Sequence, residues 1–188
     1  MSQKTPRIVV VGSSNTDMVV KSQHIPRPGE TVTGGQFVMA PGGKGANQAV
    51  AAARLGAQVT FVAKVGQDMF GDQAVANYRQ EGIATDFIFR DAELATGVAL
   101  ILVDEQGENL ISVASGANHA LRPEDVQRAS AAIRAADVLV LQLEIPLDTV
   151  TYAAKLAAEA GVAVILDPAP APAEPLDASL MRHLACVK

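Results

Sequence analysis

The residues best suited to bind a ligand lie in a glycine-rich stretch, residues 41–49. Its consecutive glycines, Gly42 and Gly43, bring bare backbone N–H groups to the start of a predicted helix, where they can hold an anion or hydroxyl groups. A nucleotide-binding P-loop is excluded because Lys44 is followed by Gly45 rather than by Ser or Thr. On its own, the stretch is equally compatible with a glycine-rich turn and a solvated lysine.

Three further polar side chains follow predicted strands. Asn15 and Asp17 come after the apolar residues 8–11, and Glu144 comes at the end of the predicted strand at residues 138–143. In open α/β sheets ligands bind beyond the carboxyl ends of the strands, and amides and carboxylates can hydrogen-bond to vicinal hydroxyls. Each also has an ordinary alternative: a polar turn for the first two, and a helix cap or a solvated carboxylate for the third. If the fold brings these side chains to one crevice, they would form a binding site for a polyhydroxylated ligand: Asn15, Asp17, Lys44, Asn47 and Glu144.

An α/β fold must position these residues. The β-branched run at residues 8–11 predicts a central strand that helices cover on both faces. Further strands are predicted at residues 59–63, 138–143, 162–166 and 185–187, and helices at residues 46–55, 68–81, 123–136, 147–160 and near Leu180. Asp68 is expected to cap the second helix. Strands that alternate with helices imply a parallel sheet with right-handed crossovers.

Two other regions indicate a separate patch of β structure. Residues 18–40 contain short alternating stretches broken by proline and glycine, which predicts irregular strands. Residues 96–103 and 109–114 flank a turn-forming segment and are predicted to pair as a hairpin with one solvated face.

The composition narrows the class of protein. The chain has 188 residues, 49% of them hydrophobic, which suffices for one α/β domain. A net charge of −5 without a basic run argues against a nucleic-acid partner. We expect no membrane association and a cytoplasmic location, because the chain offers no signal-peptide pattern and no apolar run of membrane-spanning length. Cys186, the only cysteine, permits no internal disulfide, and the three histidines lack ligand-like spacing and are interpreted as surface or loop residues: His24, His119 and His183.

Taken in order, several clusters resemble the ribokinase family of carbohydrate kinases. They lie at residues 12–17, 28–31, 42–49, 96–99, 116–118, 141–144 and 167–170. The likeness covers essentially the whole chain, and an ordered set of this kind is far more specific than a lone glycine motif.

The resemblance implies a three-layer ribokinase-like fold, in which helices flank a central, mostly parallel sheet and a small β-sheet forms a lid. Residues 1–188 would be the N-terminal part of such a domain, with lid strands from about residues 18–40 and 96–114. Lids of this kind often join two protomers into a homodimer. In that family, the sugar hydroxyls are held by residues matching Asn15, Asp17, Gly43, Lys44, Asn47 and Glu144. The apolar Ala99 and Ile101 would touch the sugar from the lid.

The reaction that the resemblance implies is transfer of the γ-phosphoryl group of ATP to the 5-hydroxyl of D-ribose, with Mg²⁺ and K⁺ as cofactors. In that family, the catalytic aspartate and the adenine and cation sites lie beyond the position of Lys188, so this chain is expected to contain no catalytic residue and to be inactive alone. Two alternatives stay open: a related sugar kinase, such as a 2-deoxyribokinase or a fructokinase, and a non-catalytic sugar-binding or dimerising module.

Overall fold

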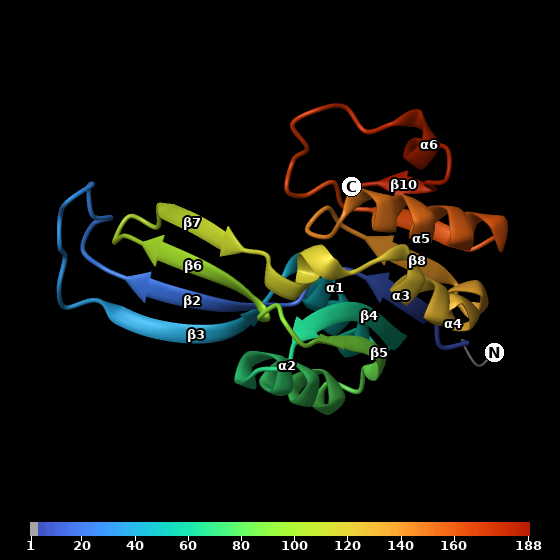
Figure 1. Ribbon diagram of the computed structural model, residues 1–188, viewed down its shortest axis with the longest axis horizontal. Coiled ribbons are helices and arrows are strands. Elements are labelled where there is room, and N and C mark those ends of the chain that lie inside the picture. The colour runs from blue at the N-terminus through green and yellow to red at the C-terminus, as the bar shows by residue number, and fades with distance from the viewer. Residues whose placement is uncertain (1–3) are drawn as a thin grey trace.

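A six-stranded parallel sheet forms the centre of the molecule in the computed structural model, which describes residues 4–188 (Figure 1). Its strand order is β10-β9-β8-β1-β4-β5, and all its pairs are parallel. The strands are β1 (Arg7–Val11), β4 (Gln58–Gly66), β5 (Ala84–Asp91), β8 (Val138–Leu141), β9 (Ala163–Leu166) and β10 (Cys186–Val187). The predicted α/β fold with a parallel sheet is confirmed.

Helices cover both faces of this sheet. They are α1 (Lys44–Arg54), α2 (Met69–Gln80), α3 (Pro123–Arg128), α4 (Ser130–Ala135), α5 (Leu147–Glu159), α6 (Ala178–Met181) and the 3-10 helix η1 (Gly116–Ala120). Successive side chains of a strand point to opposite faces, so Val9 and Val11 of β1 pack into the cluster formed with α3, α4 and α5, whereas Val10 packs with Ala46 and Ala49 of α1. The central β-branched strand is therefore buried on both faces, as predicted.

One predicted helix is wrong in its extent. Residues 123–136 form two short helices, α3 and α4, rather than one. At Ala129 between them, the N–H bonds to the carbonyl of Val126 at 2.9 Å, which tightens the turn. The resulting bend lets both helices contact α5.

Strand β5 has no counterpart among the predictions. It lies at the edge of the sheet, paired only with β4, and most of its residues are half-buried or exposed. Charged Asp86 and Arg90 interrupt its apolar residues, as is common at edges that face solvent.

A separate four-stranded sheet, of order β3-β2-β6-β7, extends away from the helices (Figure 1). It consists of β2 (Asn15–Lys21), β3 (Gln36–Gly42), β6 (Gly97–Val103) and β7 (Asn109–Ala114). We call it the small sheet. β2 pairs antiparallel with β3 and parallel with β6, and β6 and β7 form the predicted hairpin. The polar turn that was the alternative for Asn15 and Asp17 is wrong, because both residues belong to β2.

Among the described residues 4–188, no helix has the length and apolar character needed to cross a membrane.

Candidate functional site

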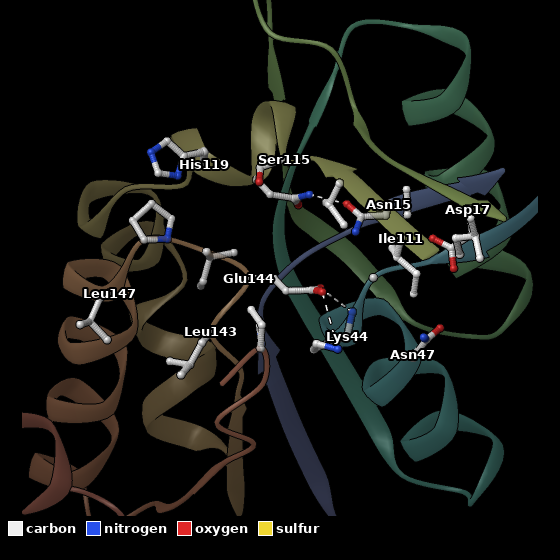
Figure 2. Close-up of a pocket in the computed structure, with 18 residues that line it drawn as sticks. Asn15, Asp17, Lys44, Asn47, Ile111, Ser115, His119, Leu143, Glu144 and Leu147 are labelled. Carbon is white, nitrogen blue, oxygen red and sulfur yellow. Dashed lines mark hydrogen bonds and ion pairs between the residues drawn. The ribbon is translucent and has the colours of Figure 1, made fainter. Parts of the chain in front are cut away.

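A pocket of about 590 Å³ lies where the small sheet meets the carboxyl edge of the central sheet (Figure 2). Residues from β2, β6, the start of α1 and the segment after β8 contribute to it. All the site residues predicted from the sequence line this one pocket: Asn15, Asp17, Gly43, Lys44, Asn47, Ala99, Ile101 and Glu144. Residues up to 129 positions apart in the chain are thus brought together by the fold.

Strand β2 presents two of the polar side chains. Asn15 and Asp17 are two positions apart on an extended strand, so they lie on the same face of the small sheet. Gly42 pairs with Asn15 across the antiparallel ladder, and a side chain at position 42 would collide with the Asp17 carboxylate. Glycine at that position therefore leaves room for Asp17 at the edge of the pocket.

The turn into α1 requires glycine for its backbone conformation. Gly43 caps the helix with φ 93°, in the left-handed region that side chains disfavour. A Cβ atom there would also lie 2.9 Å from the backbone nitrogen of Asn15. The glycine-rich stretch is thus packed tightly against the segment that follows β1.

The side chain of Glu144 binds to the N-terminus of α1. Its Oε2 accepts hydrogen bonds from the Lys44 backbone N–H at 2.9 Å and from Ser13 Oγ at 2.6 Å, and its Oε1 lies 3.8 Å from Lys44 Nζ. A carboxylate at a helix N-terminus is favoured by the helix dipole. The backbone N–H of Lys44, which the sequence suggested for an anion or hydroxyl, is therefore bound by a side chain of the same protein.

Asp17 has a different electrostatic environment. Burial raises the pKa of its carboxyl above the ordinary value of 3.8, and the negative charge of Glu144 raises it further, whereas the charge of Lys44 lowers it. The carboxylate is thus less strongly stabilised as an anion than an exposed aspartate. Hydrogen bonds donated by a ligand hydroxyl would stabilise the ionised carboxylate of Asp17.

Asn118, on η1, was not predicted as a site residue, although it lies in one of the clusters that carry the family resemblance. It is 2% exposed, and its side chain contacts both Ser14 and Asn15. Nothing in its sequence neighbourhood signals this role, because the contact joins segments about a hundred positions apart.

The sequence alone does not indicate the rest of the pocket wall. These residues are Ile111, Val113, Ser115, His119, Leu143, Ile145, Pro146, Leu147 and Pro170. The first two alternate along β7 on the face that pairs with Ile101, so the period of two in this strand was the available signal. His119 is exposed, as interpreted, but it borders the pocket.

The donor set does not fit a divalent cation. No group of three or more His, Cys, Asp or Glu side chains within residues 4–188 is arranged to hold a metal ion. The two carboxylates of the pocket are Asp17 and Glu144, and the second is already bound by Ser13 and Lys44.

Comparison with known proteins gives a consistent result. Residues 5–188 match the family model described as pfkB family carbohydrate kinase. The chain is 42% identical over 172 residues to a ribokinase of Mus musculus, and the matched region covers 92% of this chain and 53% of that protein. It is 41% identical over 164 residues to a deoxyribokinase of Salmonella typhi, which covers 87% of this chain and 54% of that protein.

A solved structure of Arabidopsis thaliana ribokinase complexed with ribose and ATP is similar with a TM-score of 0.83 and 31% identity. The similarity covers 98% of this chain and 60% of that one. The chain thus spans about half the length of the curated relatives it matches.

Proposed function

The chain belongs to the pfkB family of carbohydrate kinases, and on this basis we propose that the whole protein phosphorylates D-ribose at its 5-hydroxyl with ATP, residues 1–188 forming its sugar-binding part. The single observation that carries the proposal is the convergence of all eight predicted residues on one pocket.

The lining of the pocket suits a sugar because it offers both polar and apolar groups. The polar groups of Asn15, Asp17 and Asn47 can pair with hydroxyls. Ala99 and Ile101 of β6 also line the pocket, and Ala99 pairs with Asp17 across the ladder between β2 and β6. These apolar side chains can pack against the C–H groups of a furanose ring. Ribose exposes both kinds of surface, so a pocket lined by both kinds of group can hold it.

The described residues contribute binding and orientation. Asp17 accepts hydrogen bonds from hydroxyls, while Glu144 holds the start of α1 in place through Lys44. Fixing the sugar in this way would lower the entropic cost of bringing its reacting hydroxyl to the phosphoryl donor. Apolar side chains of the small sheet would exclude water from the sugar.

ATP would supply the phosphoryl group, with Mg²⁺ and K⁺ as further cofactors, as the family resemblance implies. That resemblance assigns their sites and the catalytic base to segments beyond position 188. No residue of this chain is therefore proposed as catalytic, and we expect the 188-residue chain to bind ribose without turnover.

A 2-deoxyribokinase is the second candidate, since the identity to a deoxyribokinase, 41%, nearly equals the identity to a ribokinase, 42%. Asn15 favours ribose, because its amide can pair with a hydroxyl that 2-deoxyribose lacks. Comparing the dissociation constants of the two sugars decides between the candidates: weaker binding of 2-deoxyribose supports a ribokinase, and equal or tighter binding supports the alternative.

The decisive experiment combines calorimetric titration of the chain with D-ribose and an ATP-dependent phosphorylation assay. The variant Asp17→Asn should lose most of the ribose affinity, whereas Asp86→Asn, a matched change on the exposed edge strand, should not alter it. Absence of ribose binding would contradict the proposed function. Turnover would contradict the assignment of catalysis to other segments.

A homodimer formed through the small sheet is the proposed assembly. Large apolar side chains are exposed on both of its faces: Phe37, Val38, Met39, Leu100, Leu110, Ile111 and Val113. An exposed apolar patch of this kind marks an interaction surface. A second copy of the chain is the partner that the family resemblance implies.

A further inference from the structure

Asn118 connects the segment after β1 to the pocket. Its Oδ1 accepts a hydrogen bond from the Ser14 backbone N–H at 2.8 Å. Its Nδ2 donates to the Ser14 carbonyl at 3.1 Å and to Asn15 Oδ1 at 2.7 Å. Both residues are buried: Asn118 is 2% exposed and Asn15 is 5% exposed.

The polarity of this arrangement is set by the backbone. A backbone N–H can only donate and a backbone carbonyl can only accept, so the two groups of Ser14 determine which end of the Asn118 amide carries oxygen. Both Nδ2 protons of Asn118 are then used, one by Ser14 and one by Asn15. The Asn15 amide must therefore turn its oxygen towards Asn118.

The nitrogen of Asn15 is what remains for a ligand. Figure 2 shows this nitrogen turned away from the bond to Asn118 and towards the interior of the pocket. Gly97 makes the bond possible, because a side chain at that position would collide with Asn15 Oδ1 and Asn118 Nδ2.

We propose that Asn118 is a positioning residue that makes Asn15 a hydrogen-bond donor to the sugar. This inference rests on the proposed function, because it concerns the same sugar site. It specifies that the ligand group facing Asn15 must be able to accept a hydrogen bond. Asp17, on the same face of β2, needs the opposite, a group that donates. Together they select two hydroxyls with complementary roles.

Sugar derivatives test this selection. Replacing the hydroxyl at position 2 by hydrogen leaves the Asn15 N–H groups without a partner, and replacing it by a protonated amino group sets donor against donor. We expect 2-deoxyribose to bind about tenfold more weakly than ribose, and 2-amino-2-deoxyribose at least as weakly.

Side-chain amide exchange tests the orientation without any ligand. In the ¹⁵N-labelled chain, the Asn118 amide protons should exchange slowly with water and those of Asn15 rapidly. The reverse pattern would mean that the two amides have the opposite orientation and would overturn the proposal. This measurement also distinguishes a failure of the proposed function from a failure of the inference about Asn118. A chain that does not bind ribose would contradict the proposed function, whereas amide exchange alone tests the orientation of the Asn15 side chain.

Variants test whether Asn118 acts through Asn15. Asn118→Asp keeps the acceptor for the Ser14 N–H and removes the donor to Asn15, so ribose affinity should fall about tenfold. In an Asn15→Ala background the same change should alter affinity by less than about twofold. Equal losses in both backgrounds would overturn a positioning role.

Two controls complete the test. Asn109→Asp makes the same change of charge on an exposed residue at the far end of β7 and should leave ribose affinity unchanged. Gly97→Ala disturbs the hydrogen bond between Asn118 and Asn15 by steric contact and removes neither polar group. It therefore provides a second test if Asn118→Asp fails to fold. Ribose binding by Gly97→Ala as tight as that of the unmodified chain would contradict the proposal.

Discussion

The carboxylates of Asp17 and Glu144 line the same pocket but have different surroundings. Glu144 is bound on one oxygen, Oε2, by Ser13 and by the backbone N–H of Lys44, and its other oxygen lies 3.8 Å from Lys44 Nζ. Asp17 is partly desolvated and has a raised pKa. Glu144 therefore stabilises the local structure through one oxygen, whereas the hydrogen bonds of Asp17 are left for a ligand to supply.

The raised pKa of Asp17 predicts a pH dependence of ribose binding. Because the ionised form accepts hydrogen bonds from hydroxyls, affinity should decline as the pH falls towards a pKa that lies above 3.8. In Asp17→Asn, the remaining weak binding should lack this decline. Calorimetric titrations from neutral to mildly acidic pH make the comparison, and an affinity of the unmodified chain that does not change with pH would contradict the role of the carboxylate.

Replacing Ser13 should lower the stability of the folded chain without removing a predicted sugar contact. In Ser13→Ala, the charge-assisted hydrogen bond to Glu144 is lost, which should lower the free energy of unfolding by about 1–3 kcal/mol. Urea denaturation measures the change. The matched control is Ser112→Ala, at an exposed position of β7, which should leave stability unchanged. A similar effect of both substitutions would argue against a specific role for Ser13.

At the scale of elements, one carboxylate links a helix to the small sheet. Asp68 caps α2 through the Gly71 N–H at 2.8 Å, and it also accepts hydrogen bonds from the backbone and the hydroxyl of Thr96, at the base of β6. Burial alone would raise the pKa of Asp68, but these hydrogen bonds outweigh it and lower the pKa below 3.8.

Replacing this cap should therefore destabilise the chain in a pH-dependent way. Asp68→Ala should lower the free energy of unfolding by about 1–2 kcal/mol at neutral pH. A carboxyl whose folded-state pKa is lowered contributes stability above its unfolded-state value, and that contribution disappears as the pH falls through the folded-state value. The difference from the unmodified chain, measured by thermal unfolding, should shrink in acid. A constant difference would exclude the carboxylate charge as its source.

The elements that the sequence predicted well are those with a strong local signal. The β-branched run at residues 8–11 and the Asp68 cap each depend on neighbouring residues, and the structure contains both. The break at Ala129 depends on packing against α5, and β5 depends on pairing with β4, so neither is encoded locally.

The same distinction holds for the site. Strand ends and a glycine turn indicated the polar residues of the predicted site and Gly43, because a parallel sheet brings such segments to one edge. Ala99 and Ile101 were predicted only through the family resemblance. Asn118 and Ser13 escaped notice, since their roles arise from hydrogen bonds between segments that are far apart in the chain.

At the scale of the whole molecule, the small sheet should govern self-association. Phe37 is 63% exposed and Leu110 is 53% exposed, an arrangement that favours contact with another apolar surface. We expect the 188-residue chain to be dimeric or aggregation-prone in size-exclusion chromatography with light scattering. Phe37→Lys should shift it towards the monomer, and a monodisperse monomer of the unmodified chain would contradict the expectation.

Strand β2 has a mechanical consequence for the molecule. Asn15 and Asp17 lie at its base, while its far end, Lys21, is roughly 20 Å away at about 3.3 Å per residue. Pairing with β3 and β6 along all of β2 makes the strand stiff. Any tilt of the small sheet about its base would therefore be amplified along the strand: a movement of the pocket side chains by a fraction of an ångström would displace the far end of the sheet by several times that distance.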